Sequence, residues 1–352
     1  MKKFYSLAFV LLLAMATVLA GCGNSESSGG SGSEGSEGEG GVEKIKLVAA
    51  HNQTSPDNPY QVGLLKFKEV AEAQSNGNIE VEVHAGTIGT EESELVEKLK
   101  LGAADVVLVS PGFMTQTGIK EIDLLALPYL FDSYEHWENV VDGEVGEEMA
   151  ALINEKSNND FKLVGYWSAG VRHYYGKKPL ESMEDLKGLT IRTQTSGAVA
   201  EYWKQAGAIP TSVAWGELYQ ALQQNVVDSA ENSYPYYVQQ NHHKTDNGKY
   251  TTETGHDYTT RFLLVNGKKF DSYSKETQDL ILEAAAASVE AEREALYAQE
   301  DEYKQTLIND GGEVNEIDRA PFIELAGPLH DQAAKDMGAA AEALLQKIRD
   351  LK

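Results

Sequence analysis

The feature that most constrains the fold is an alternation of short apolar runs with helix-length segments, which begins after a polar N-terminal stretch. The sequence predicts strands over 44–50 and 79–84, helices over 60–74 and from Glu91, and a buried strand within 102–112. Strands that alternate with helices of this length favour an α/β fold with largely parallel sheets. A body of about 300 residues favours two lobes over a single core.

A weak internal repeat supports two similarly built lobes. Residues 94–105 read ELVEKLKLGAAD and residues 217–228 read ELYQALQQNVVD. In each copy the helix is expected to end at a residue that tolerates the left-handed conformation, Gly102 or Asn225. Each copy then leads into an expected strand, VVLV in the first and VV in the second.

The C-terminal part is mostly helical. The pattern over 275–304 predicts one helix, and about 30 residues in a helix span about 45 Å, enough to run across two lobes. The turn-forming run at 309–312 ends it, 313–317 (EVNEI) predicts a short strand, and Pro321 starts further helices.

The N-terminus predicts export. Lys2 and Lys3 precede the apolar run 7–20, which is too short for a membrane span and is typical of a signal peptide over 1–21. The run ends in LAGC, which resembles the lipobox of bacterial lipoproteins, so the leader is expected to be cut before Cys22 and the thiol to be lipidated. A plain secretory leader with an incidental cysteine is the alternative.

Residues 22–43 are rich in Gly, Ser and Glu, a composition that predicts a flexible tether between the lipid anchor and the folded body. Cys22 is the only cysteine, so no intrachain disulfide is expected. We therefore expect an extracytoplasmic lipoprotein, anchored to the outer face of the cell membrane.

Charge limits the possible partners. The formal net charge is −25, and without the two lysines and five glutamates of the leader and tether it is −22. Such a body would repel nucleic-acid phosphates, so no nucleic-acid partner is expected. An anionic ligand would need a local basic site that reverses the field of the whole protein.

The motifs of common enzymes are missing from the sequence. It has no Gly-rich phosphate loop, no CxxC pair and no HExxH motif. In GYWSAG, Trp167 stands where a GxSxG elbow needs its nucleophile, so Ser168 is a poor candidate. We expect neither a catalytic site nor a cofactor.

The pair His242-His243, with Asp246 and His256 nearby, is the one candidate metal site. Adjacent histidines point in different directions on any regular element. A surface or structural role is therefore favoured, and no metal is expected.

Polar and aromatic residues gather at expected strand ends and in the loops that follow them, where open α/β sheets bind ligands. Arg192 closes the run LTIR, and residues 189–197 contain no Asp or Glu, although a buried arginine needs an anion. The other candidates near strand ends are Arg172, His173, Gln194, Trp215, Glu217, Glu231 and Asn232.

Each candidate also has a structural interpretation. An arginine at a strand end is more often an ion-pair partner than a ligand clamp. Trp215 could belong to the core, Glu217 could complement a helix dipole, and Asn232 could form a turn.

Three segments carry a resemblance to a known family. They are LALPYLFDSYEHWENVVDGEVG, AGVRHYYGKKPLESMEDLKGLTIR and WGELYQALQQNVVDSAEN. From about residue 44 to the C-terminal helices, the chain resembles the DctP-like substrate-binding proteins of TRAP (tripartite ATP-independent periplasmic) transporters.

The resemblance implies an α/β, two-lobed periplasmic-binding-protein fold with a cleft between the lobes and a long lobe-spanning helix. Lobe I is expected to comprise 44–168 and 258–297, and lobe II 169–257 and 298–352. The expected partners are a small organic-acid ligand and the small and large TRAP membrane subunits.

The resemblance also implies a site. Arg192 matches the family's carboxylate clamp, and a guanidinium fork binds a carboxylate bidentately, which a lysine cannot do. The other residues expected to bind the ligand are Arg172, Asn232, Trp215, His51, Asn52, Ser110, His173, Gln194 and Glu217.

Departures from the family pattern bear on the ligand. In sialic-acid binders the position of Ser110 is acidic and an arginine follows shortly, whereas this chain reads Ser-Pro-Gly-Phe-Met. The usual Gly-Gln before the EN pair is Ser229-Ala230. Several aromatic and hydrogen-bonding groups favour a sugar acid such as a hexuronate. A C4-dicarboxylate, a keto acid or a ligand-sensing role are the alternatives.

Overall fold

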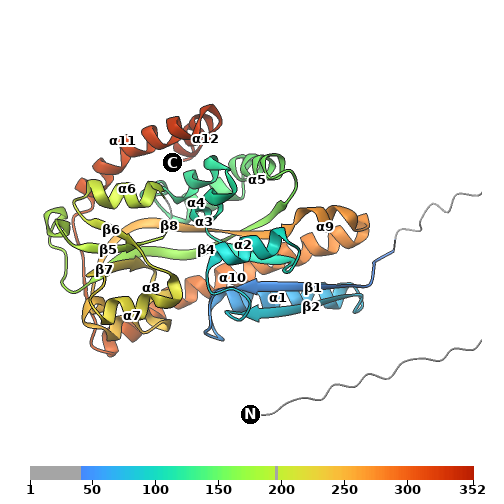
Figure 1. Ribbon diagram of the computed structural model, residues 1–352, viewed down its shortest axis with the longest axis horizontal. Helices are drawn as coiled ribbons and strands as arrows, with labels where there is room; N and C mark the ends of the chain where they lie inside the picture. Colours follow the sequence, from blue (N-terminus) through green and yellow to red (C-terminus); the bar gives the residue numbers. More distant parts are fainter. Residues whose placement is uncertain (1–40, 195–196) are drawn as a thin grey trace, which may run out of the picture. The chain divides into compact units, whose positions relative to one another are not determined.

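The computed structural model describes residues 41–194 and 197–352 (Figure 1). The predicted signal peptide, Cys22 and nearly all of the predicted tether lie outside the described residues.

The described strands form one sheet in the order β2-β1-β3-β8-β4-β7-β5-β6, with β9 paired to β8. Their bounds are β1 Ile45–His51, β2 Ile79–Ala85, β3 Val106–Val109, β4 Phe161–Gly176, β5 Thr190–Thr193, β6 Ile209–Ser212, β7 Ser229–Asn232, β8 Tyr250–Asn266 and β9 Glu313–Asn315.

The sheet has two parallel parts joined by two long crossing strands. β1 pairs in parallel with β2 and β3, and β5 pairs in parallel with β6 and β7. β4 and β8 pair antiparallel along most of their length and link the two parts, β8 to β3 and β4 to β7. The α/β prediction is confirmed, and the antiparallel pairing is confined to the links.

Helices cover both faces of the sheet. Their bounds are α1 Pro59–Gln74, α2 Glu92–Lys100, α3 Pro111–Met114, α4 Tyr134–Val141, α5 Glu144–Lys156, α6 Gly197–Gln205, α7 Leu218–Gln223, α8 Tyr234–Gln239, α9 Gly267–Ser272, α10 Lys275–Asn309, α11 Ala320–Met337 and α12 Ala339–Asp350. Figure 1 shows α4, α5, α11 and α12 on one side and α1, α7 and α8 on the other.

The pleat of the strands explains this arrangement. Val106 and Leu108 of β3 pack in the apolar cluster with α1, α8 and α10, while Val107 and Val109 pack in the cluster with α4, α5 and α12. Successive strand residues point to opposite faces, so an apolar run such as VVLV supplies both cores.

The long C-terminal helix is confirmed. α10 has 35 residues, which correspond to about 52 Å, and it packs against α1, α8 and β4. It begins at the N-cap Ser274, whose side chain accepts a hydrogen bond from the Thr277 N–H. It therefore runs past the crossing strands and contacts elements of both predicted lobes.

The predicted helix ends of the internal repeat are confirmed, but one of the two strands predicted to follow them is wrong. Gly102 and Asn225 both have left-handed φ angles, 74° and 59°. In the second copy, however, Val226 is 55% exposed and its N–H donates to the Ala221 carbonyl, so this backbone closes the helix. The strand β7 begins only at Ser229.

The crossing strand β4 is irregular between Ser168 and Val171, where Gly170 has a φ of +82°. Carboxylates of α10 accept the backbone N–H groups there. Glu292 Oε2 accepts from Ser168 at 3.1 Å and Glu300 Oε1 from Val171 at 2.7 Å. The predicted lobe boundary falls in this segment, and the lobe boundaries stay a prediction.

Candidate ligand-binding site

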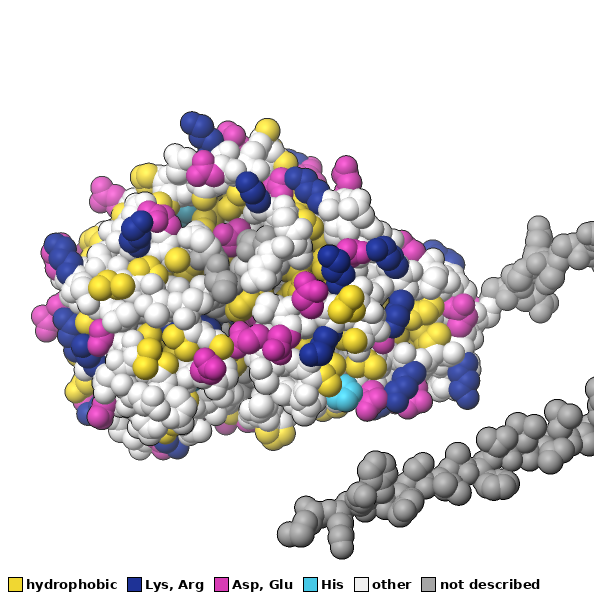
Figure 2. All heavy atoms as spheres, viewed as in Figure 1, with side chains coloured by type: hydrophobic (Ala, Val, Ile, Leu, Met, Phe, Trp, Pro, Cys, Tyr) yellow, Lys and Arg dark blue, Asp and Glu magenta, His cyan; other side chains and the backbone are white. Residues whose placement is uncertain are grey.

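A narrow cavity lies where strands of the two predicted lobes meet. Ser110 after β3, Arg172 of β4, Gln194 after β5 and Glu231 of β7 line it, together with residues of β8. Acidic and basic side chains are interspersed over the molecular face shown in Figure 2. This mixed surface charge is distinct from the charge of the buried arginines in the interior.

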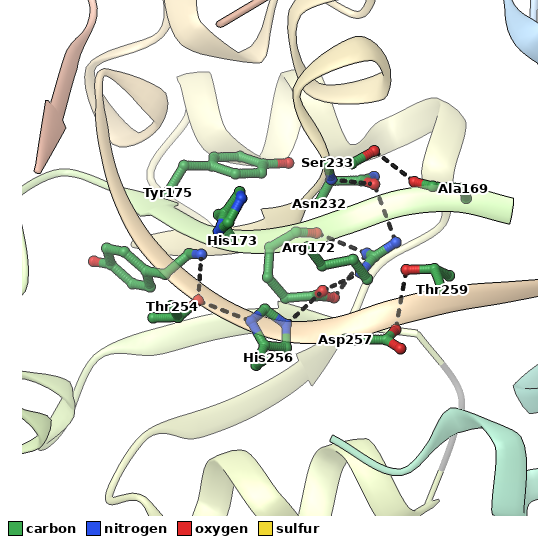
Figure 3. Close-up of polar contacts among 12 residues, drawn as sticks. Ala169, Arg172, His173, Tyr175, Asn232, Ser233, Thr254, His256, Asp257 and Thr259 are labelled. Carbon is green, nitrogen blue, oxygen red and sulfur yellow. Dashed lines mark hydrogen bonds and ion pairs between the residues drawn. The ribbon is translucent and has the colours of Figure 1, made fainter. Parts of the chain in front are cut away.

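Arg172 belongs to a closed network at this cavity, which we call the paired corner (Figure 3). It consists of Arg172, Glu231, Asn232 and His256. Arg172 Nε and Nη2 donate to the Glu231 carboxylate, Nη2 also donates to the Glu231 carbonyl at 2.7 Å, and Nη1 donates to Asn232 Oδ1 at 3.0 Å. His256 Nε2 lies 3.2 Å from Glu231 Oε2.

The charges of the paired corner balance. Arg172 is 3% exposed and Glu231 is 2% exposed. Burial by itself raises the pKa of Glu231, but the charge of Arg172 and the hydrogen bonds from His256 and Arg172 outweigh it and lower that pKa to about 2. A buried ion pair with this many hydrogen bonds is stable only as a unit.

Arg192 lies in a second corner, which we call the open corner and which consists of Arg192, Val213 and Trp215. Arg192 is 2% exposed, its Nε donates to the Val213 carbonyl at 2.9 Å, and its Cζ lies 5.7 Å from the ring centroid of Trp215. Its Nη1 has no hydrogen-bond partner among the described residues.

An acidic group from the other predicted lobe contacts the open corner. Glu91, before α2, accepts a hydrogen bond from the backbone N–H of Trp215 at 2.7 Å, and burial raises the pKa of Glu91. Burial also lowers the pKa of Arg192. A buried cation with an unused donor is costly unless an anion completes it, so the open corner has the chemistry of an anion site.

The end of β1 forms a third polar group. His51 Nε2 lies 2.8 Å from Gln61 Oε1, and its Nδ1 accepts from the Gln53 N–H. Asn52 accepts from Gln53 Nε2 at 3.0 Å. Burial lowers the pKa of His51 to about 4, so its ring is neutral at pH 7. His51 and Asn52 are buried but lie outside the cavity lining.

Ser110 lines the cavity with its hydroxyl already engaged. Its N–H and its Oγ each lie 2.5 Å from Glu92 Oε2. The other oxygen of Glu92 lies 3.9 Å from Arg261 Nε. Ser110 therefore orients Glu92, a buried carboxylate that the sequence analysis did not single out.

Two predicted site residues, His173 and Glu217, lie outside the cavity lining. His173 Nδ1 accepts from the Gly255 N–H at 3.0 Å, and burial lowers its pKa to about 3. Glu217 is exposed at the start of α7, where a carboxylate complements the helix dipole. The structure thus groups Arg172, Gln194 and Ser110 at the cavity and Arg192 with Trp215, while Asn232 hydrogen-bonds Arg172 without lining the cavity.

The contribution of β8 to the cavity was not predicted from the sequence. His256, Asp257 and Arg261 line the cavity, and Glu231, which was noted without a role, is the counter-ion of Arg172. A sequence signal existed in GHDYTTRF, where five polar residues (His, Asp, two Thr and Arg) precede the apolar end of a largely buried strand.

The two adjacent histidines bind different neighbours. His242 Nδ1 lies 2.8 Å from the Tyr175 hydroxyl, and His243 Nε2 lies 2.9 Å from Asp310 Oδ2. Across the described parts of the chain, no group of three or more potential ligand side chains is placed to hold a metal ion.

Comparison with known proteins identifies the family. Residues 49–336 match DctP, the bacterial extracellular solute-binding protein family 7. The chain belongs to this family. Within the described residues, no helix has the length and apolar character needed to cross a bilayer.

Individual DctP-family relatives differ in what they bind. The chain is 28% identical over 303 residues to the C4-dicarboxylate-binding periplasmic protein DctP of Rhodobacter capsulatus, covering 85% of this chain and 89% of that protein. It is 25% identical over 277 residues to the sialic acid-binding periplasmic protein SiaP of Vibrio cholerae, covering 77% and 83%.

Solved structures of TRAP periplasmic solute-binding proteins share the fold. One from Sulfitobacter, with bound β-D-galacturonate, has a TM-score of 0.81 and 26% identity, covering 87% of this chain and all of that chain. One from Anaerococcus prevotii, with bound D-glucuronate, has a TM-score of 0.82 and 25% identity, covering 88% and 98%. The two-lobed α/β prediction is confirmed, and the protein is a solute-binding protein of the TRAP type.

Proposed function

We propose that this protein captures a hexuronate and delivers it to the membrane subunits of a TRAP transporter. The observation that carries the proposal is the open corner, where the buried Arg192 keeps Nη1 without a partner among the described residues. Proteins of the same fold that bind β-D-galacturonate and D-glucuronate support a sugar acid as the ligand.

The mechanism is capture without chemistry. Arg192 docks the carboxylate, and the Trp215 ring packs against the guanidinium face. Gln194, two residues further along the chain, lines the cavity and can hydrogen-bond a ring hydroxyl. A ligand that contacts both lobes binds the closed state better than the open one and so shifts the equilibrium toward closure.

Five further predicted residues belong to the proposed site. Arg172 lines the cavity on the side of β4, and Asn232 at the end of β7 accepts a hydrogen bond from Arg172 Nη1. His51, Asn52 and Ser110 belong to the first lobe, and their strand ends supply its face of the site on closure.

A C4-dicarboxylate is the second candidate ligand. The likeness to the C4-dicarboxylate-binding protein of Rhodobacter capsulatus favours it. A dicarboxylate would place one carboxylate at Arg192 and direct its second toward the cavity.

A thermal-shift screen of hexuronates, C4-dicarboxylates and keto acids tests the proposal. A ligand that binds only the native state raises the unfolding midpoint, and a ligand at 100 times its Kd adds about 2.7 kcal/mol. We expect D-glucuronate or D-galacturonate to give the largest shift, followed by calorimetry for the affinity. Larger shifts with succinate or malate would show that the ligand is a dicarboxylate and not a uronate.

We propose further that Cys22 carries a lipid that tethers the protein to the outer face of the cell membrane. The motif LAGC and the Gly/Ser/Glu composition of 22–43 support it. In cells fed a labelled fatty acid, the full chain should take up label and fractionate with membranes, and Cys22→Ser should abolish both. Label retained by the variant would refute the anchor.

A further inference from the structure

The strand β8 presents a set of polar side chains to the cavity that the capture of a single carboxylate does not use. Asp257, Thr259 and Arg261 alternate along β8, so the pleat directs them to one face, and all three line the cavity. Asp257 is the register partner of Arg172 on β4. Figure 3 shows Asp257 and Thr259 on β8 beside Arg172.

Asp257 keeps one oxygen available. Its Oδ2 accepts from Thr259 Oγ1 at 3.1 Å, and among the described residues Oδ1 has no hydrogen-bond partner. The side chain is half-buried at the cavity. A carboxylate oxygen in this position is an acceptor for a hydroxyl group.

The surrounding charges leave Asp257 as the surplus anion. Glu231 neutralises Arg172, and Glu92 lies 3.9 Å from Arg261. Burial raises the pKa of Asp257 to about 6, although Arg172, His256 and Arg261 act to lower it; Glu231 adds to the increase. A further anion placed here would meet a like charge in a poorly solvated site.

The position of Asp257 in the sheet separates it from the clamp. β4 and β7 lie between β8 and β5, so the backbones of Asp257 and Arg192 are separated by three strand spacings, roughly 14 Å measured across the sheet. In the proposed capture, a ligand docked at Arg192 would therefore have to extend over β4 and β7 for its far end to reach Asp257.

We propose that Asp257 is a specificity-determining residue that accepts a ring hydroxyl at the end of the ligand remote from Arg192 and rejects a second carboxylate there. The inference rests on the proposed capture of a sugar acid. It explains how a site with three buried arginines can favour a monocarboxylate. Arg172 and Arg261 have the acidic partners Glu231 and Glu92, and Arg192 takes the single carboxylate.

Calorimetry at pH 8, where Asp257 is ionised, tests this inference with D-glucuronate, D-galacturonate and succinate. We expect Asp257→Asn to weaken hexuronate binding at least about tenfold and to strengthen succinate binding, so that the affinity ratio falls by more than tenfold. The matched control is Asp246→Asn, because Asp246 is exposed and absent from the cavity lining. It should bind like the wild type.

Thr259→Val is the second variant, because it removes the hydroxyl that orients Asp257 while leaving the carboxylate in place. It should shift the ratio in the same direction by a smaller factor, and it keeps the test valid if Asp257→Asn fails to fold. An unchanged ratio in folded variants would overturn the role of Asp257 and leave uronate capture intact. Wild-type protein that binds neither uronate would overturn both.

Discussion

The paired corner and the open corner place buried arginines in opposite situations. In the paired corner, Arg172 makes four hydrogen bonds to Glu231 and Asn232, and its charge is balanced within the protein. In the open corner, Arg192 is equally buried but donates only from Nε, to a carbonyl, among the hydrogen bonds of the described residues. The comparison teaches that neither burial nor a single unused donor marks a binding arginine by itself. Among the described residues, Arg261 and Arg293 also keep an unused Nε, but each has a carboxylate within 4 Å, whereas Arg192 has none.

The largest effect is expected when the paired corner is broken. Arg172→Met leaves Glu231 buried without its counter-ion, so the free energy of unfolding should fall by about 3–5 kcal/mol. Chemical denaturation of the ligand-free protein measures this. A loss below 1 kcal/mol would mean that Glu231 finds another partner or takes up a proton.

The paired corner should also give the protein acid sensitivity. The pKa of Glu231 is lowered to about 2 from an unfolded value of 4.5, so the folded state binds fewer protons between these values. The stabilisation is fully present above pH 4.5 and is lost as the pH falls toward 2.

Unfolding at pH 5 and at pH 3 measures this dependence. The double variant Arg172→Met with Glu231→Gln should lose less stability than the wild type between these pH values, by on the order of 2 kcal/mol. Equal losses in both proteins would place the acid-sensitive group elsewhere, for example at the buried neutral His51.

The open corner should affect binding rather than stability. Arg192→Lys keeps the charge but loses the planar fork, so ligand affinity should fall at least tenfold, about 1.4 kcal/mol or more. Arg192→Met should abolish measurable binding while leaving the unfolding free energy of the ligand-free protein unchanged or higher, because it removes an uncompensated buried charge. Unchanged affinity in calorimetry would refute the clamp.

The smallest effect is expected at Glu217, the predicted site residue that is exposed at the start of α7. Glu217→Gln should leave ligand affinity within about twofold and change stability by no more than about 0.5 kcal/mol. A larger loss of affinity would show that closure brings α7 to the ligand.

Much of the fold could be predicted from local sequence. The strands near 45 and 79, the helix near 60 and the long helix from 275 follow from periodicity and turn residues, and each is present. The expected strand at Val226 was wrong because the same backbone N–H groups close the preceding helix. Neighbouring elements compete for such backbone N–H groups, and hydrophobic periodicity does not show which element obtains them.

The site was predictable in part. The position of Arg192 at a strand end without a local acid is visible in the sequence. The acidic partner of Arg172 is 59 residues away along the chain, and the partnership exists because β4 and β7 are neighbours in the sheet. The role of β8 was missed for the same reason, since its polar residues meet the cavity only through pairing with β4.

The sequence by itself determined the α/β architecture, the strand ends that carry polar residues and the lack of a local anion for Arg192, because these depend on side-chain periodicity and backbone preference over a few residues. Only the tertiary structure decided which arginine is neutralised, that Asp257 and Arg261 reach the cavity, and that Glu217 faces solvent. Charge pairing and burial depend on which distant strands become neighbours, and that is fixed by the packing of the whole sheet.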